Sequence, residues 1–222
     1  MDSIDYYNRY AVPYYEETVD ASMEEVMKPF VELLSEESEN AEVLDLGCGS
    51  GRDTLLLEEY GFYVTPMDGS EEMCKLAEVN TDKEVLQMTY DEMEFDDVFD
   101  GIWACASLIH LTEDEMRKVM KKLVQALKEN GVLYFSVHRG DRDGIYHGRY
   151  FHDYNRRELQ SLMEEYPELE VVDIWTTQDV RSEKSDKLWL NVLARKTGKE
   201  SLQESLDGVV PARLLRFIWY RI

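Results

Sequence analysis

The sequence predicts an α/β protein with a doubly wound, seven-stranded, mostly parallel sheet that ends in a C-terminal antiparallel strand pair. Three observations support this fold class. Short apolar runs alternate along the chain with longer segments of helical period, as in a parallel sheet covered by helices. The first apolar run leads directly into a glycine-rich loop. The last two runs have no long helix between them, so they should pair antiparallel at a sheet edge.

The strands are expected at the short apolar runs, in the order 41–46, 62–67, 84–88, 99–104, 131–137, 171–176 and 188–195. Apolar residues three and four apart predict the helices between them, at 54–60, 70–80, 113–127 and 155–166. Asn130-Gly131 and Tyr166-Pro167 are expected to end the last two of these helices.

Three parts are expected along the chain. Residues 1–40 should form a helical cover, with one or two helices over 4–34 and with Pro13 and Pro29 at a first turn or a break. Residues 41–196 should form the core. Residues 197–222 are an extension without an assigned role, and its arginines and bulky apolar side chains could lie on a membrane surface, dock on the core or join two copies as a homodimer.

Charge and composition limit the partners. The chain has 222 residues with 24 Lys+Arg against 47 Asp+Glu, a formal net charge of -23. Such a surface repels phosphate backbones and anionic lipids, which argues against nucleic acid. No stretch approaches the ~20 apolar residues of a membrane span, and the first residues lack the pattern of a signal peptide. Three scattered cysteines fit a reducing compartment, so a cytoplasmic protein is expected.

The strongest motif is the glycine loop at 45–51, DLGCGSG, which follows an apolar run and precedes a helix. Glycines permit a sharp turn and a close approach of a ligand, but dinucleotide-binding loops use them in the same way. Here the third glycine falls at Gly51, one residue before the dinucleotide pattern requires it. Asp45 precedes the first glycine by two residues, where it would face ammonium or hydroxyl groups and repel a pyrophosphate. The loop therefore favours a cationic nucleoside.

A second acidic residue supports this interpretation. The second apolar run ends at Asp68, where a carboxylate can accept hydrogen bonds from both hydroxyls of a ribose, as expected for an adenosine. The alternatives are that Asp68 only caps the helix that starts near Ser70, and that Asp45 is an incidental surface acid.

These residues resemble the class I S-adenosylmethionine-dependent methyltransferases, and the resemblance covers about residues 6–196. It rests on the glycine loop 45–51, the ribose segment 64–73, the fourth strand 99–104 and the turn with the fifth strand at 127–133. Further details at 51–54, 103–108 and 148–151 resemble the small-substrate branch known as tellurite-resistance-type methyltransferases. The resemblance implies a Rossmann-like sheet and S-adenosyl-L-methionine as the cofactor.

The resemblance also implies roles for single residues. Gly47 and Gly49 should lie beneath the methionine part of the cofactor, with Asp45 at its amino end and Asp68 on the ribose. The implied cofactor-binding set in the core is Asp45, Gly47, Cys48, Gly49, Gly51, Asp68, Gly69, Thr89, Tyr90 and Ala104.

The adenine segment departs from the family pattern. Thr89 stands where many relatives have an acidic or amide residue, and Tyr90 where they have a small one. Backbone contacts from these two residues are expected to hold the adenine edge instead.

Tyr7 and Tyr14 are expected to cover the cofactor, because they are seven residues apart on one helical face of a segment that folds over the cofactor in this family. Tyrosine faces attract a sulfonium and exclude water from it. The alternative is that these rings only pack the helix onto the sheet.

The acceptor is expected at the same edge of the sheet. His110 follows the fourth strand and could orient or deprotonate a nucleophile, or else cap the helix that starts near Thr112. Arg139, Arg149 and Tyr150 follow the fifth strand in a glycine-containing loop and suggest an anion pocket, although solvated loop charges are the alternative. No residue is assigned as an obligatory acid or base.

The sequence thus predicts an enzyme that moves the methyl group of S-adenosylmethionine to a small-molecule acceptor by in-line displacement. Alignment and desolvation can supply much of such a rate enhancement, ~7 kcal/mol from positioning alone. The alternatives are a non-catalytic module that binds the cofactor or S-adenosylhomocysteine, a methyltransferase acting on a protein or a nucleic-acid base, and a nicotinamide-dependent oxidoreductase.

Overall fold

The computed structural model describes residues 2–38, 40–181 and 186–198. Seven strands form one sheet in the order β3-β2-β1-β4-β5-β9-β8. Every neighbouring pair is parallel except β5-β9 and β9-β8. The predicted fold class, with its antiparallel pair near the C-terminus, is confirmed. The strands are β1 Glu42–Leu46, β2 Tyr63–Asp68, β3 Leu86–Gln87, β4 Phe99–Ala104, β5 Leu127–His138, β8 Leu169–Gln178 and β9 Leu188–Lys196.

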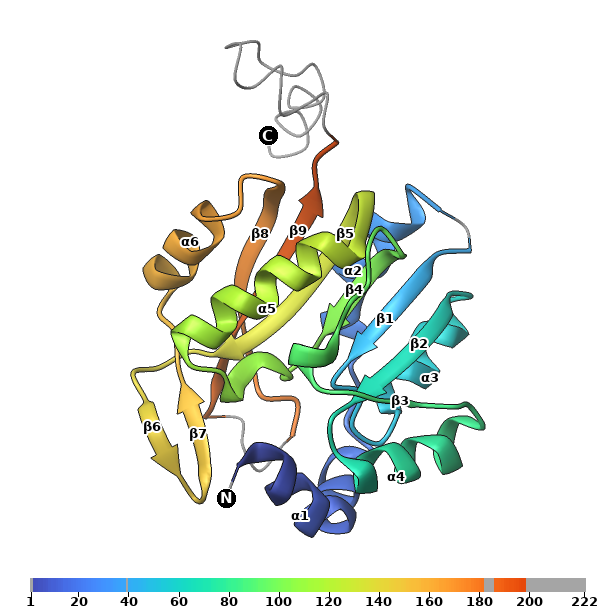
Figure 1. Cartoon of the computed structure of the whole chain (residues 1–222), viewed down its shortest axis with the longest axis vertical. Helices are drawn as coiled ribbons and strands as arrows, with labels where there is room; N and C mark the ends of the chain where they lie inside the picture. The colour runs from blue at the N-terminus through green and yellow to red at the C-terminus, as the bar shows by residue number, and fades with distance from the viewer. Residues whose placement is uncertain (1, 39, 182–185, 199–222) are drawn as a thin grey trace.

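Helices cover both faces of the sheet. Figure 1 shows α5 and α6 in front of it, α2 and α3 behind it, and α1 beyond the carboxyl ends of the parallel strands, next to α4. Two short 3-10 helices, η1 and η2, follow β3 and β4. The helices are α1 Ser3–Thr18, α2 Glu24–Ser35, α3 Arg52–Glu59, α4 Glu71–Thr81, η1 Tyr90–Glu92, η2 Leu108–His110, α5 Glu113–Ala126 and α6 Arg156–Glu164.

Each face buries its own apolar core. On the α5 side, Met116, Met120 and Leu123 are fully buried at the spacing of one helical face. On the α2 side, Phe30 packs against Trp103, whose ring stacks on that of Tyr134 at 3.9 Å. Burying one such side chain contributes about 1.5–3 kcal/mol, so the two cores hold the sheet between its helical layers.

Pro13 lies where the sequence predicts, because the backbone of Tyr10 leaves helical geometry (φ -119°, ψ 25°) and Pro13 falls in the first turn after this kink of α1. Two other local predictions are wrong. Pro29 lies inside α2, not at a first turn or a break. Asn130 does not end α5, which stops at Ala126; it has φ 65° within β5, close to a register shift against β4.

The sequence prediction missed a two-stranded hairpin, β6 Asp143–Tyr146 with β7 Arg149–His152. Its two turn residues, His147 and Gly148, both have positive φ (50° and 81°), as in the two-residue turns whose twist matches the strands. The glycine at the second turn position was the available signal. The strands themselves are four residues each, and their apolar residues are adjacent instead of alternating.

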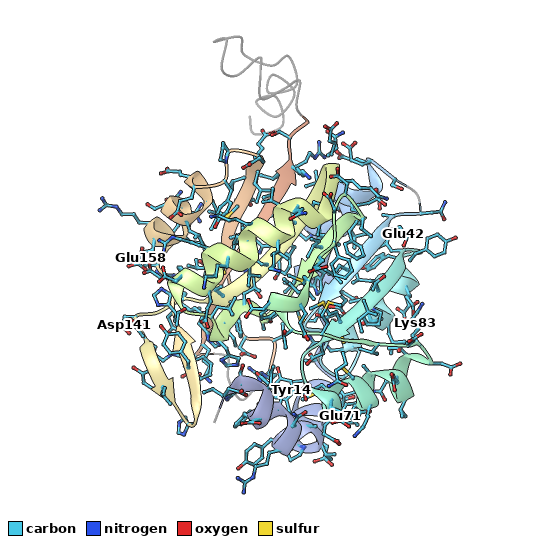
Figure 2. The ribbon with its side chains drawn as sticks, viewed as in Figure 1. Tyr14, Glu42, Glu71, Lys83, Asp141 and Glu158 are labelled. Carbon is cyan, nitrogen blue, oxygen red and sulfur yellow. The ribbon has the colours of Figure 1, made fainter. Side chains whose placement is uncertain are left out.

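This topology brings several chain segments to one edge of the sheet. The parallel strands β1, β4 and β5 end there, whereas β9 begins there because it runs in the opposite direction. Figure 2 shows Tyr14 of α1 at this edge and Glu42, the first residue of β1, at the other. The predicted C-terminal extension lies outside the described residues from position 199 onward, so its proposed docking or dimer role stays a prediction.

Candidate active site

The glycine loop turns sharply between β1 and α3. Gly47, Gly49 and Gly51 have φ of 74°, 57° and 85°, in the left-handed region that glycine adopts without strain. A Cβ on Gly47 would lie 2.5 Å from Ser107 Oγ, whereas one on Gly49 would meet nothing within 4 Å. Gly47 therefore permits close packing, and Gly49 keeps one side of the loop open.

A cavity of about 230 Å³ lies at this edge of the sheet. Its walls come from α1, the glycine loop, the end of β5, the start of β9, the hairpin and the segment after β8. Seven of the predicted site residues line it: Tyr7, Tyr14, Asp45, Gly47, Cys48, Gly49 and Arg149. Residues separated by more than a hundred positions therefore meet in one enclosed space.

Asp45 is the acidic group of the cavity nearest the loop. Its side chain is buried at 2% exposure, and its Oδ2 accepts a hydrogen bond of 2.6 Å from the Thr54 hydroxyl. No group of the described chain donates to Oδ1. Burial, and then the negative charge of Asp53, raise the pKa of Asp45 above its usual range. A ligand cation next to this carboxyl would stabilise its ionised form.

Another carboxyl of the cavity wall, Asp53, forms an ion pair with Arg52. It accepts hydrogen bonds from Arg52 Nε at 2.7 Å and from the indole N–H of Trp103 at 2.9 Å. The sequence prediction did not include this pair. Of these two carboxyls, Asp45 has no guanidinium hydrogen bond among the described residues, whereas Asp53 has one.

Asp68 holds the loop rather than lining the cavity. Its Oδ2 accepts the N–H of Gly49 at 2.9 Å and its Oδ1 the N–H of Ser70 at 2.8 Å. Burial raises its pKa to about 6, although these backbone hydrogen bonds act in the opposite direction. The helix α4 is capped by Ser70 itself, whose hydroxyl accepts from Met73 N–H. Each carboxylate oxygen of Asp68 has a further lone pair for a ribose hydroxyl.

The predicted adenine segment is occupied by contacts within the protein. Thr89 caps η1, with its N–H and hydroxyl both bonded to Glu92. The Tyr90 hydroxyl donates to the Ser107 carbonyl at 3.0 Å and lies 2.9 Å from its hydroxyl. These residues, with Gly51, Gly69 and Ala104, are not part of the cavity wall.

The other three predicted cofactor residues outside the cavity pack against the protein. A Cβ on Gly51 would lie 2.6 Å from a methyl carbon of Thr81 in α4, and one on Gly69 would lie 3.1 Å from Ile4 of α1. Ala104 is fully buried in the core. Gly51 and Gly69 thus permit helix packing at the loop.

The tyrosines of α1 cover the cavity. The rings of Tyr7 and Tyr14 meet edge to face, with centroids 5.2 Å apart, so the two residues share a face as their spacing predicts. Burial raises the pKa of both hydroxyls. Tyr6, which the sequence prediction omitted, also lines the cavity. Neutral aromatic rings here exclude water from whatever is bound below them.

His110 is not in the cavity wall and does not cap α5, which Thr112 and Glu115 cap. Its Nδ1 lies 2.7 Å from the Tyr150 carbonyl and its Nε2 lies 3.2 Å from the Tyr7 hydroxyl. A carbonyl only accepts, so Nδ1 carries the proton and Nε2 accepts from Tyr7. Burial lowers the pKa of His110 to about 4, which keeps the ring neutral. His110 therefore connects α1 to the hairpin.

Of the three residues predicted to bind an anion, Arg149 lines the cavity, whereas Arg139 and Tyr150 do not. The Nη1 of Arg149 donates to the Tyr7 hydroxyl at 3.1 Å. The prediction that Arg139 and Tyr150 face the same pocket is not supported. Arg139 is exposed, because only its backbone is held, by Leu188. The Tyr150 hydroxyl turns to Asp143 on the partner strand of the hairpin.

Sequence reasoning missed most of the cavity wall outside α1 and the glycine loop. His138 Nδ1 accepts from Arg142 Nη2 at 2.8 Å, and Arg142 also binds both oxygens of Asp153. Residues of the β5-β9 pair, Tyr134 and Asn191, are joined by a hydrogen bond of 2.7 Å. The available signal was position, since His138 ends β5 and Asn191 lies near the start of β9.

The two cysteines of the cavity wall are not activated as nucleophiles. Burial raises the pKa of the Cys48 and Cys105 thiols, so both stay protonated near neutral pH. No group of three or more metal-ligating side chains occurs within the part of the chain that the structure describes.

None of the described helices is both long and apolar enough to cross a membrane.

A parallel sheet with one reversed strand, a glycine loop after β1 and a helical cover over that loop together define a methyltransferase-type α/β fold. Residues 44–135 match the family model described as a methyltransferase domain. This stretch of the chain is therefore similar to a methyltransferase domain, which agrees with the class I S-adenosylmethionine-dependent resemblance of the sequence. The finer resemblance to the tellurite-resistance-type branch stays a prediction.

Known proteins with related sequences are methyltransferases by name. A putative methyltransferase, YqeM of Bacillus subtilis, is 37% identical over 107 residues, which are 45% of this chain and 43% of that protein. The chain thus spans less than half the length of this relative. An uncharacterised methyltransferase of Staphylococcus carnosus is 27% identical over 175 residues, 74% of this chain and 81% of the relative.

Among solved structures, 1,6-didemethyltoxoflavin-N1-methyltransferase of Burkholderia thailandensis has the same fold. It superposes with a TM-score of 0.65 at 23% identity, over 88% of this chain and 85% of that one. That crystal structure holds 1,6-didemethyltoxoflavin and S-adenosylhomocysteine. At 23% identity the likeness concerns the fold, and it does not identify a substrate of the present chain.

Proposed function

We propose that this chain transfers the methyl group of S-adenosylmethionine to a small-molecule acceptor by in-line displacement, in the cytoplasm. The observation that carries the proposal is Asp45, a buried carboxyl that lines the cavity and whose Oδ1 has no hydrogen-bond donor among the described residues. A ligand with an ammonium and a sulfonium suits this carboxyl better than a pyrophosphate does. The open side of Gly49 leaves room for the ligand to lie against the loop.

The chain's own residues would hold the cofactor and exclude water. Asp45 would pair with its amino end, and Asp68 would accept from its ribose hydroxyls. When bound, the cofactor supplies an electrophilic methyl group on a sulfonium sulfur. The rings of Tyr7 and Tyr14 would cover that sulfonium with neutral, polarisable faces, which favours a cation and keeps water away.

Proton transfer needs no dedicated base in this proposal. His110 is neutral, but its Nε2 already accepts from Tyr7, and it does not reach the cavity. His138 lines the cavity, but its Nδ1 already accepts from Arg142. The wall that the structure describes therefore aligns and desolvates an acceptor that arrives with its nucleophilic pair available.

Two measurements test the proposal. Calorimetry should show that the full chain binds S-adenosylmethionine and S-adenosylhomocysteine but not a nicotinamide dinucleotide. Incubation with methyl-labelled cofactor and a panel of thiols, phenols, amines and organic acids should then give a labelled small product. Failure of folded protein to bind either sulfur nucleoside would refute the cofactor assignment, and binding without turnover on any acceptor would favour a non-catalytic sensor.

A further inference from the structure

The cavity holds one arginine whose charge is not balanced by a carboxylate. Four arginines line it among the described residues, and three of them form ion pairs at 2.7 Å: Arg52 with Asp53, Arg142 with Asp153 and Arg181 with Asp179. Arg149 has no carboxylate partner within the described ranges. In a chain with a formal net charge of -23, such a guanidinium facing a cavity calls for an explanation.

The donors of Arg149 are only partly used. Nη1 donates to the Tyr7 hydroxyl, whereas Nε is buried without a hydrogen-bond partner. Nη2 also has none among the described groups. Aromatic faces surround the cation, with its Cζ 3.9 Å from the ring centre of Tyr6 and 5.1 Å from that of Phe151. Those faces stabilise the charge but leave the in-plane N–H donors unsatisfied.

The two unused donors of Arg149 lie on the same edge of its guanidinium group. Nε and Nη2 form one edge of the guanidinium plane, which presents two parallel N–H groups. A carboxylate matches such an edge with its two oxygens. The Nη1 bond to Tyr7 and the ring of Tyr6 fix the plane of the group, so the unused edge has a defined direction.

Neighbouring groups add neutral donors and a flat wall. His138 accepts on Nδ1 from Arg142, so the neutral ring carries its hydrogen on Nε2, which has no partner in the described chain. The ring of Phe151 lies 5.7 Å from that of His138 and 4.6 Å from the Arg142 guanidinium carbon. An anion on this side of the cavity thus meets hydrogen-bond donors around an aromatic surface.

We propose that Arg149 selects an anionic acceptor, a small flat organic acid whose carboxylate binds the Nε and Nη2 edge of the guanidinium while its body lies against Phe151. This inference rests on the proposed function and names the class of its acceptor. The unused edge of Arg149 offers two parallel N–H groups, a geometry that one planar carboxylate matches with both of its oxygens.

The cofactor also carries a carboxylate, on its methionine part, and could in principle supply the anion. Position favours the acceptor. Arg149 comes from the hairpin after β5, whereas the arginine whose charge acts on Asp45, the residue proposed for the cofactor's amino end, is Arg52. The two sources differ in what the removal of Arg149 should do.

The test uses the full chain and pairs of probes that differ in charge but little in shape. Salicylate and salicylamide, and 4-hydroxybenzoate and 4-hydroxybenzamide, are titrated calorimetrically into protein saturated with S-adenosylhomocysteine. Wild-type protein should bind at least one acid about tenfold or more tighter than its amide. Arg149→Gln should abolish this preference, and Arg149→Lys should keep part of it, because lysine retains the charge without the planar fork.

Arg139→Gln is the matched control, since Arg139 lies on the same connection but is exposed and outside the cavity. It should leave the preference unchanged, and circular dichroism melts show that each variant is folded. The proposal is overturned if no acid binds better than its amide, if Arg149→Gln keeps the preference, or if Arg149→Gln weakens S-adenosylhomocysteine as much as the acids. The last result would assign the arginine to the cofactor.

Failure of the proposed function has a separate signature. If S-adenosylhomocysteine does not bind to wild-type protein, the cofactor assignment fails, but titration of the same acid and amide pairs into the free protein still measures the charge preference. A tenfold preference that depends on Arg149 would then support an organic-acid site in a protein with another activity.

Discussion

Asp45→Asn should weaken cofactor binding while leaving the fold intact. The substitution keeps the shape of the side chain and an oxygen that can accept from the Thr54 hydroxyl, but it removes the negative charge. A hydrogen bond to a charged partner contributes about 1.5–3 kcal/mol, so S-adenosylhomocysteine should bind about 10- to 150-fold more weakly. The variant should be at least as stable as the wild type, because the pKa of Asp45 is raised by burial and by Asp53, so its ionised form is disfavoured in the free protein.

The same residue predicts a pH dependence. A bound ammonium stabilises the ionised carboxylate, so the pKa of Asp45 falls on binding and a proton is released. Wild-type affinity should therefore rise with pH, by at most tenfold per unit, up to the raised pKa of the free protein. Asp68, whose pKa is about 6, adds to this rise only in the more acidic range. Above about pH 8 the cofactor's own amino group loses its charge, which sets the upper limit.

Calorimetry between pH 6.5 and about 8, in buffers of different ionisation enthalpy, counts the released protons. Asp45→Asn should flatten the dependence. Asp100→Asn is the control, because Asp100 lies at the opposite edge of the sheet, where it bonds to Lys128 and to the N–H of Glu42. Equal affinity of wild type and Asp45→Asn, or no proton release, would refute the role given to this carboxyl.

Three other predictions concern the loop and the histidine. Asp68→Ala should weaken S-adenosylhomocysteine by about 1–3 kcal/mol, measured by calorimetry, and an unchanged dissociation constant would contradict the ribose assignment. Gly47→Ala and Gly49→Ala both place a Cβ at positive φ, so both should lower the melting temperature, and Gly47→Ala should lower it more because its Cβ would also lie 2.5 Å from Ser107 Oγ. Gly49→Ala should also reduce cofactor affinity, and equal melting temperatures of the two variants would contradict the open side of the loop. Folding lowers the pKa of His110 from 6.5 to about 4, so the unfolded chain binds a proton on this ring more tightly than the folded chain does. As the pH drops from 6.5 to 4, His110 should therefore lower the free energy of unfolding by up to about 3 kcal/mol. Urea unfolding of His110→Gln should show a shallower loss, and an identical pH profile would contradict it.

The fold was predictable because its signals are local. The apolar run before Gly47 and the residue spacing in α5 can each be recognised within a short stretch of sequence. The absence of a long helix between β8 and β9 implied that these two strands pair antiparallel. The hairpin was missed because its strands are only four residues each and their apolar residues do not alternate, which leaves only the glycine of its turn as a signal. Pro29 shows the limit of propensity, since α2 continues past this proline to Ser35.

The site was predictable on the loop side and much less so on the acceptor side. Asp45 follows from its distance to Gly47 along one strand. The role of His110 depends on the Tyr150 carbonyl and on Tyr7, which are distant in sequence, and the direction of Arg139 depends on which way an exposed side chain turns. Such facts arise from tertiary contacts that no short window of sequence contains.

The two halves of the cavity come from separate stretches of the polypeptide. The loop and acids proposed for the cofactor lie within positions 45–68, whereas the hairpin and the start of β9, proposed for the acceptor, lie within 138–191. Exchange of the later stretch between relatives could therefore redirect which compound is modified without disturbing the donor. In such chimeras α1 would be the element that has to suit both parents, because Tyr7 touches the hairpin arginine while its own helix packs beside α4.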